Sequence, residues 1–385
     1  MKILKLITLA LLISITSVNA QIQTGAENTE TYIPMLKNQR VGVLANQTSK
    51  IGKTHLIDSL LARQIKVSKI FIPEHGLRGD YETGKLINNS IDKKTGIPIY
   101  SLYGKHKKPT MSDFNDIDVL LFDLQDVGCR FYTYINTLHY VIEACSQFHV
   151  KLIVLDRPNP NAYFVDGPVL ENKTKSFVGM QNIPIVYGLT IGELAMFIYK
   201  EYTEKEFGKC DLTVIKLKGW NHNSKYKLPI APSPNLPNHT SIILYPSLCL
   251  FEGTVVSVGR GTDFPFQVFG APYLPNKKFS FTPHPVKGAA SNPKHNNKLC
   301  GGIDLRDTAE KYQEEGKLNL SYLIYAYKHY PFKDAFFNKY FTKLAGTEEL
   351  EQQIRSGWTE EEIRFSWKEK LDKYKEKRKK YLLYD

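Results

Sequence analysis

Apolar runs in the first half of the chain each end abruptly in polar residues. Three of them, VSKIFI (67–72), VLLF (119–122) and KLIVL (151–155), read as nearly continuous apolar strands. Strands of that kind lie in parallel sheets that are covered on both faces. The polar residues that follow these runs are Glu74, His75 and Arg78, then Asp123, Gln125, Asp126 and Arg130, and finally Asp156, Arg157 and Asn159. Because ligands bind outside the carboxyl ends of strands in open α/β sheets, these residues are the first candidates for a functional site.

The segments between these runs have the periodicity of helices. RVGVLAN (40–46) predicts a first strand that ends at Asn46, and residues 54–64 and 134–148 carry apolar residues at three- and four-residue intervals. Alternating strands and helices predict an α/β fold with a Rossmann-like parallel sheet over residues 28–205. No GxGxxG motif follows the first strand, so the fingerprint of a dinucleotide site is missing from the sequence.

The composition of the sequence changes near residue 205, where the alternation of strands and helices ends. A chain of 385 residues is too long for one ordinary core, which predicts two domains. Beyond the change lie a proline- and asparagine-rich segment (231–241), a glycine-rich segment (253–273) and a Lys/Glu-rich helical end. We therefore expect a smaller α+β domain over residues 206–385. Its long loops are expected to be functional covers, since structureless loops of that length are uncommon inside compact domains.

Residues 1–20 are typical of a secretory signal peptide. Lys2 and Lys5 give a basic start, LITLALLISIT is the apolar stretch, and the small-residue cleavage site ends at Ala20. That apolar stretch is too short to span a bilayer, and no later segment is long and apolar enough for a membrane helix. We expect an exported protein, periplasmic or secreted, without stable membrane insertion.

The chain is basic and has an odd number of cysteines. Removal of Lys2 and Lys5 with the signal lowers the formal charge from +12 to +10. Export argues against a nucleic-acid partner, whereas an anionic envelope polymer fits a basic surface; charge that only keeps the protein soluble explains the excess equally well. The five cysteines lack CxxC spacing, which argues against a disulfide framework or a zinc site and leaves one bridge open. Most of them read as small buried residues.

Glu74 is the strongest catalytic candidate, with His75 beside it to orient it. A carboxyl group at a strand end between apolar walls can donate a proton to a substrate. The same glutamate could instead tie loop amides together, and both interpretations stay open here. Glycosidic hydrolysis usually needs a second carboxylate, which Asp123 or Asp126 could supply. Asp126 is the more loop-like of the two, so Asp123 is the predicted partner, unless either acid forms an ion pair with Arg130.

Arginines and tyrosines in the loops are the predicted means of binding a substrate. A guanidinium suits a two-pronged contact with a carboxylate, and tyrosine rings suit stacking on sugars. Some of these arginines are expected to balance internal acids instead. The predicted substrate-binding residues are Asn46, Arg78, Gln125, Asp126, Arg130, Tyr132, Asn159, Tyr187 and Arg260. HExxH, GxSxG and GxxxxGK[ST] motifs are all missing from the sequence, so we predict no metal, no cofactor and no acyl-transfer nucleophile.

A series of motifs also resembles a known family, the exo-acting β-N-acetylmuramidases (NamZ-like), formerly a domain of unknown function. The similar motifs are VGVLANQTS, FIPEHGLRGD, TGIPIYSLYG, FDLQDVGCRFYTYI, VLDRPNPN, DGPVLE, PSPNLP, YPSLCLFEGT, SVGRGTDFPF, CGG and YLLY. They run in order over nearly the whole chain after the signal. One departure is APSPNLP, where the family more often has another proline and a methionine, which we interpret as packing variation.

The resemblance implies a Rossmann-like domain, a smaller C-terminal domain and a cleft between them. It further implies removal of terminal N-acetylmuramic acid from the non-reducing ends of peptidoglycan fragments, with Glu74 of PEHG as the catalytic carboxyl. A non-catalytic protein that binds peptidoglycan fragments in the same cleft is the alternative. An amidase or esterase is disfavoured, because no activated nucleophile or metal cluster is evident. Retention, inversion or substrate assistance, and the oligomeric state, stay open.

Overall fold

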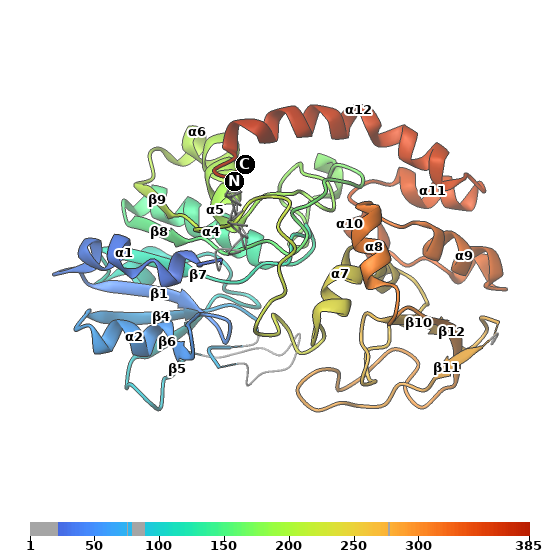
Figure 1. Cartoon of the computed structure of the whole chain (residues 1–385), viewed down its shortest axis with the longest axis horizontal. Helices are drawn as coiled ribbons and strands as arrows, with labels where there is room; N and C mark the ends of the chain where they lie inside the picture. The colour runs from blue at the N-terminus through green and yellow to red at the C-terminus, as the bar shows by residue number, and fades with distance from the viewer. Residues whose placement is uncertain (1–21, 75, 79–88, 276–277) are drawn as a thin grey trace, which may run out of the picture.

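The computed structural model describes residues 22–74, 76–78, 89–275 and 278–385 of the chain. The predicted signal peptide and His75 therefore lie outside the described residues. Within them, a large sheet domain and a C-terminal part lie side by side, and the last long helix runs across both (Figure 1). This arrangement confirms the predicted α/β fold with a second, smaller part.

A seven-stranded sheet forms the first part, in the order β5-β6-β4-β1-β7-β8-β9. All neighbouring strands are parallel except the edge strand β5, which is antiparallel to β6. The strands are β1 (Val41–Ala45), β4 (Val67–Ile72), β5 (Ser90–Ile91), β6 (Pro98–Ser101), β7 (Val119–Asp123), β8 (Lys151–Leu155) and β9 (Leu212–Ile215). A separate hairpin pairs β2 (Lys50–Ile51) with β3 (Thr54–His55) just after β1.

Helices cover both faces of this sheet, as its nearly continuous apolar strands predict. Successive strand residues point to opposite faces. Val43 and Leu121 belong to the core under the first helices, whereas Leu44 and Phe122 belong to the core on the other face. The helices of this part are α1 (Thr29–Leu36), α2 (Leu56–Ala62), α3 (Met111–Phe114), α4 (Tyr134–Phe148), α5 (Ile191–Ile198) and α6 (Glu204–Phe207).

The direction of the chain reverses between β1 and β7. From β1 the chain builds β4 and then β6 on one side, and it returns to build β7, β8 and β9 on the other side. Such a reversal opens a crevice at the carboxyl ends of the strands, where ligands of doubly wound sheets bind.

The C-terminal part contains a three-stranded antiparallel sheet and a group of helices. The sheet has the order β10-β12-β11. Its strands are β10 (Val268–Ala271), β11 (Phe279–Phe281) and β12 (Cys300–Asp304), and its helices are α7 (His239–Leu248), α8 (Ala309–Glu315), α9 (Ser321–His329), α10 (Tyr340–Ala345), α11 (Glu349–Arg355) and α12 (Glu360–Arg378). Short 3-10 helices include η1 (Gly25–Glu27) and η4 (Cys249–Gly253).

The large sheet extends past the domain boundary that the sequence suggests at residue 205. Strand β9 lies beyond that point and pairs with β8, so it completes the first part. The C-terminal helix α12 then returns to the first part, where the Tyr374 hydroxyl donates to the Tyr187 carbonyl at 2.7 Å. The two parts are therefore joined by a long helix as well as by the chain connection (Figure 1).

The structure also bears on two further features of the sequence, its five cysteines and its lack of a membrane helix. All five cysteines lie in the described part, where each is buried and none forms a disulfide. Among the described residues, no helix combines the length and the apolar character that crossing a membrane requires.

Candidate active site

Glu74 lines a cavity of about 300 Å³ between the two parts of the molecule. The sheet part contributes Glu74 after β4, Tyr103 after β6 and the segment 131–134 at the start of α4. The C-terminal part contributes Glu252 of η4 and Arg260, among others. We call this space the Glu74 cavity. Its polar and aromatic lining includes Glu74, Tyr103, Tyr132, Tyr134, Ser233, Asn235, Tyr245, Glu252, Arg260, Phe266 and Tyr340.

Tyrosine hydroxyls hold Glu74 in place. The Tyr103 hydroxyl donates to Glu74 Oε1 at 3.1 Å, and the Tyr134 hydroxyl donates to the Glu74 carbonyl at 3.4 Å. Burial, reinforced by the negative charge of Glu74, raises the pKa of both tyrosines. Both hydroxyls therefore keep their protons and remain donors near neutral pH. The Asn46 side-chain amide donates to Tyr134 Oη at 2.9 Å, so this predicted binding residue positions a tyrosine of the cavity.

Glu252 is a second carboxylate in the same cavity, and sequence reasoning missed it. Arg260 holds it through two hydrogen bonds, from Nε at 3.0 Å and from Nη2 at 2.8 Å. Burial lowers the pKa of Arg260, but the charge and hydrogen bonds of Glu252, together with Tyr245 and Cys249, outweigh that effect, so this pKa lies above its usual value. The sequence carries a signal for Glu252: in LCLFEG an apolar run ends in a glutamate and a glycine, much as FIPEHG does around Glu74.

Aromatic rings supply most of the remaining wall of the cavity. Tyr132 and Tyr134 meet edge to face with ring centroids 4.9 Å apart, and Tyr245 contacts Tyr132 in the same manner at 6.1 Å. Phe266 lies under the guanidinium of Arg260, at 5.2 Å from the ring centroid. An aromatic wall beside a few fixed polar groups is the composition of a small-molecule site, and it suits a sugar ring. Tyr132 and Arg260, two of the predicted binding residues, thus line the Glu74 cavity.

Asp123, the predicted catalytic partner, lies outside the Glu74 cavity. Its side chain is fully buried, and it accepts two hydrogen bonds from Arg157, from Nε at 2.6 Å and from Nη2 at 2.8 Å. The ion pair that the sequence left open therefore exists, but with Arg157 in place of Arg130. A carboxylate that is buried and paired in this way gives a substrate no access to its oxygens.

Arg130 and Arg78 also serve the fold in this structure. Arg130 is fully buried and donates to the carbonyls of Pro168, Ile183, Leu344 and Ala345 at 2.7 to 2.9 Å. Burial lowers the pKa of Arg130 to about 9. Since two of these carbonyls belong to the C-terminal part, Arg130 joins the two parts. Arg78 forms an ion pair with Asp92 at 3.2 Å and is not among the residues that line the Glu74 cavity.

The other predicted binding residues after β7 and β8 form a buried network. The Tyr187 hydroxyl and the Gly128 amide both donate to Asp126, whose pKa burial raises to about 6. Gln125 donates to the Pro158 carbonyl at 2.8 Å. Asn159 donates to the Leu189 carbonyl at 2.8 Å, and its amide lies so close to Gly128 that a Cβ there would overlap it. The strand ends therefore converge only in part: Glu74 lines one cavity with Arg260 and Tyr132, whereas Asp123 and Asn159 are buried outside it.

Comparisons with known proteins show which family the chain resembles. The family model described as exo-beta-N-acetylmuramidase NamZ, N-terminal, matches residues 41–240, and its C-terminal counterpart matches residues 243–384. The peptidoglycan beta-N-acetylmuramidase NamZ of Bacillus subtilis (strain 168) is 38% identical over 96% of this chain and 93% of its own length.

Solved structures of similar sequence share the fold over nearly the whole chain. A DUF1343 family protein from Bacteroides fragilis, 44% identical, superposes with a TM-score of 0.88 over 95% of this chain and 99% of the other. A second one from the same organism, 29% identical, has a TM-score of 0.78 over 94% of this chain and 99% of the other. Both family models together span the described sheet part and the C-terminal part. The chain therefore belongs to the exo-β-N-acetylmuramidase NamZ family.

Proposed function

We propose that this protein is an exo-acting glycoside hydrolase that releases terminal N-acetylmuramic acid from the non-reducing ends of peptidoglycan fragments. The observation that carries the proposal is that two carboxylates, Glu74 and Glu252, line the same aromatic-walled cavity in a NamZ family member. The size of that cavity supports exo action. At about 300 Å³ it lies at the lower end of small-molecule sites, which suits one sugar residue rather than a stretch of glycan chain.

Glu74 is the proton donor in this proposal. It would protonate the glycosidic oxygen as the bond to the anomeric carbon breaks, while Tyr103 orients its carboxyl group and Tyr134 holds its backbone carbonyl. Glu252 is the second carboxylate, held in one orientation by Arg260. It replaces Asp123 in that role. Glycosidic hydrolysis uses such a pair to donate a proton on one side and to stabilise or attack the sugar on the other.

Arg260 is the arginine proposed to recognise the lactyl carboxylate of muramic acid. Two of its nitrogens, Nε and Nη2, donate hydrogen bonds to Glu252, and no described residue accepts a hydrogen bond from its Nη1. A carboxylate in the cavity would therefore find a fixed cation there. When a sugar without the lactyl group binds, that donor stays without a ligand partner, and such a mismatch in a buried polar site gives strong discrimination.

The test is release of a chromophore from an aryl β-N-acetylmuramide, with the aryl β-N-acetylglucosaminide as the matched control. We expect rapid release from the muramide alone. Arg260→Met is expected to lower kcat/KM for the muramide and to narrow the gap between the two sugars. Binding of muramic acid without any release from the muramide would instead support the non-catalytic binding protein. Equal hydrolysis of both sugars would contradict anion recognition while leaving Glu74 as the acid.

The place of action in this proposal is outside the cytoplasmic membrane. The pattern of residues 1–20 supports export, and peptidoglycan is the substrate that the NamZ relative's name gives. Expression of the full chain in a bacterial host, followed by fractionation and N-terminal sequencing, tests this step. We expect a periplasmic or secreted protein that starts at Gln21, whereas an uncleaved cytoplasmic chain would contradict it.

A further inference from the structure

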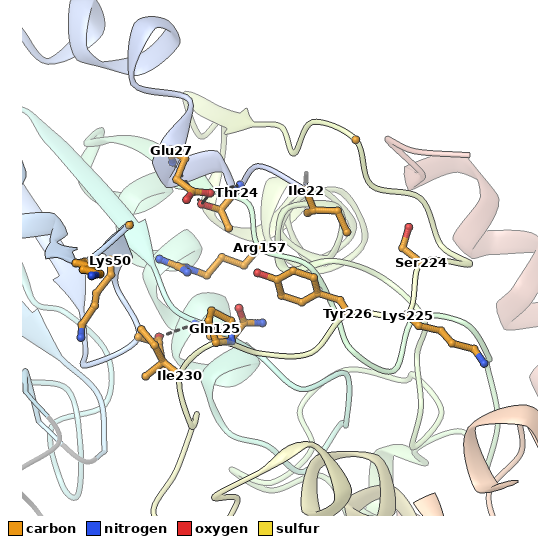
Figure 2. A pocket seen from close by; sticks show the side chains of 15 residues that line it. Ile22, Thr24, Glu27, Lys50, Gln125, Arg157, Ser224, Lys225, Tyr226 and Ile230 are labelled. Carbon is orange, nitrogen blue, oxygen red and sulfur yellow. Dashed lines mark hydrogen bonds between the residues drawn. The ribbon is translucent and has the colours of Figure 1, made fainter. Parts of the chain in front are cut away.

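A larger cavity, of about 770 Å³, opens at the point where the strand order reverses. Its floor is formed by residues that follow three adjacent strands: Thr48 after β1, Gln125 after β7 and Arg157 after β8. Gln125 and Arg157 are only 4% and 6% exposed. We call this space the switch-point cavity (Figure 2). It occupies the crevice in which doubly wound sheets bind their ligands.

The switch-point cavity is separate from the Glu74 cavity. One short segment divides them: Pro229 and Ile230 line the first, and Ser233 and Asn235 line the second. The carbonyl of Pro232, in the middle of the segment, accepts hydrogen bonds from both sides, from Gln47 Nε2 at 3.1 Å and from the Tyr132 hydroxyl at 2.9 Å. The dividing segment is thus fastened to the sheet part, and the larger cavity has walls of its own.

Segments far apart in the sequence build these walls. Residues 22–27 cross the ends of β8 and β9, where the Gly25 amide donates to the Asp156 carbonyl at 2.8 Å. Gly25 lies so close to that strand end that a Cβ would overlap the backbone of Ile215 and Asp156. Residues 219–230 form the opposite wall, and Lys50 and Lys53 of the hairpin close a third side. A cavity assembled from so many fixed pieces is a preformed one.

Basic side chains outnumber acidic ones in this lining. Lys50, Lys53, Lys225 and Arg157 are the basic residues, and Glu27 is the acidic one. Glu27 is already engaged, because its Oε2 accepts hydrogen bonds from the amide and the hydroxyl of Thr24. Asp123 offsets the charge of Arg157 through an ion pair at 2.6 Å. With Asp123 offsetting Arg157 and Glu27 offsetting one lysine, the lining keeps an excess of positive charge that favours a negatively charged ligand.

Polar groups in the middle of the cavity can fix the orientation of such a ligand. Figure 2 shows Arg157 and Tyr226 close together in the centre, with Gln125 below them and Lys50 and Lys225 toward the edges. Burial raises the pKa of Tyr226, and the charge of Arg157 acts in the opposite direction, as expected for near neighbours. Asp123 accepts hydrogen bonds from Nε and Nη2 of Arg157. No described residue accepts a hydrogen bond from its Nη1.

The local backbone argues for a carboxylate rather than a phosphate or a nucleotide. Phosphate groups in doubly wound folds sit on a glycine-rich turn that leads directly into a helix N-terminus. Here the chain after β1 enters the hairpin β2–β3 first, and the side chain of His55 caps helix α2 by accepting from the Ile57 amide. Recognition must therefore come from side-chain cations and the Tyr226 hydroxyl, next to the apolar surface of Ile22 and Ile230.

We propose that the switch-point cavity binds a small carboxylate-bearing ligand of the acidic amino-acid or peptide class. Such a ligand has two sources: the acidic stem peptide of a muramyl fragment whose sugar occupies the Glu74 cavity, or a free molecule that binds independently. The inference goes beyond the proposed function. Binding at this cavity can be measured without catalysis, so its failure is distinct from a failure of the glycosidase assignment.

The test is isothermal titration calorimetry of the full mature chain with the dipeptide alanyl-glutamate. We expect binding by the unmodified protein and equal binding by Glu74→Gln. Lys50→Gln combined with Lys225→Gln is expected to weaken it by about tenfold. Lys311→Gln combined with Lys328→Gln, two exposed lysines of the C-terminal part, is the matched control and should leave binding unchanged. Ser224→Trp, which fills the cavity, should abolish it.

Other outcomes would overturn the proposal or identify the source of the ligand. Absence of binding by the unmodified protein, equal binding by the cavity-lysine variant, or equal binding of the dipeptide diamide would each overturn it. The same dipeptide linked through its amino group to muramic acid distinguishes the two sources. Because this link turns the lactyl carboxylate into an amide, Arg260 is not part of the readout. Tighter binding of the linked form than of the free dipeptide supports a stem peptide. Unchanged affinity of the linked form supports an independent ligand.

Discussion

The ends of β4 and β7 look alike in the sequence but differ in the structure. Both strands flank β1, and both are followed by carboxylates. Glu74, after β4, lines a cavity and receives a hydrogen bond from a neutral tyrosine. Asp123, at the end of β7, is fully buried and paired with the guanidinium of Arg157.

The difference comes from what the neighbouring strand contributes to each end. Strand β6, beside β4, is followed by Tyr103, whereas β8, beside β7, is followed by Arg157. The Tyr103 hydroxyl contacts Glu74 at the wall of a cavity, whereas the Arg157 guanidinium engages both oxygens of Asp123 in the interior. The strand-end pattern alone therefore marks where polar residues gather, and the partner on the next strand decides between catalysis and structure.

The largest expected effect is the loss of turnover in Glu74→Gln. The amide keeps the size of the side chain but has no acidic proton to transfer, and general acid catalysis contributes about a hundredfold to ten-thousandfold. We expect kcat on the aryl muramide to fall by that factor, with the melting temperature unchanged. Steady-state kinetics and thermal unfolding on the same preparation measure both. A fall in kcat below about threefold would remove Glu74 as the acid.

Asp123→Asn is expected to act on stability instead. Removal of one partner from a buried ion pair leaves the Arg157 charge without compensation, which costs about 3–5 kcal/mol of unfolding free energy. Urea titration measures this cost. Activity per folded molecule should stay close to that of the unmodified protein. A stable variant with a kcat as low as that of Glu74→Gln would reverse the assignment of the two strand ends.

Asp126, also at the β7 end, predicts a specific pH dependence of stability. Burial raises its pKa in the folded protein from 3.8 to about 6, so the folded state keeps a proton that the unfolded state loses. Stability from this group is thus complete below the unfolded pKa and is lost as the pH rises through about 6. Relative to Asp126→Asn, the unmodified protein should lose about 2 kcal/mol between pH 4 and pH 7.

Urea titrations of both proteins at several pH values measure this difference. Groups such as Asp156, whose pKa burial raises to about 7, contribute equally to both proteins and cancel in the comparison. A constant difference in unfolding free energy across the range would mean that Asp126 stays ionised in the folded protein.

The fold was predictable because its signals are local. Apolar strands such as 119–122 and helical periodicity such as that of α4 are written in consecutive residues. The domain boundary was harder to predict, because β9 joins the sheet only after two helices and a change in sequence composition. Nothing local distinguishes a strand that continues an old sheet from one that starts a new domain.

The site was predictable only where a single segment carries it. Glu74 and Tyr132 follow from their own motifs, and Arg260 follows from its glycine-flanked loop. The pairing of Asp123 with Arg157 depends on a contact between separate segments, and that of Glu252 with Arg260 depends on how the loop between them folds. Arg130 shows the same limit: its glycine- and aromatic-flanked sequence suggests a substrate contact, yet its partners are four backbone carbonyls.

The smallest expected effect is that of Tyr103→Phe, which tests the neutral partner at the β4 end. The variant removes the hydroxyl that donates to Glu74 at 3.1 Å and keeps the ring. A single hydrogen bond contributes about 0.5–1.5 kcal/mol net, so kcat should fall by about threefold to tenfold. The fall should appear in kcat rather than in KM, because the hydroxyl acts on the orientation of Glu74.

The double variant Glu74→Gln with Tyr103→Phe shows whether Tyr103 acts through Glu74. If its hydroxyl only orients the acid, the double variant should be no slower than Glu74→Gln alone, since there is no longer an acid to orient. A further fall in the double variant, by the same factor as in Tyr103→Phe, would mean that the hydroxyl contacts the substrate directly. In that case Glu74 and Asp123 would differ in role because only Glu74 is accessible from the cavity. The type of residue that follows the neighbouring strand would not explain the difference.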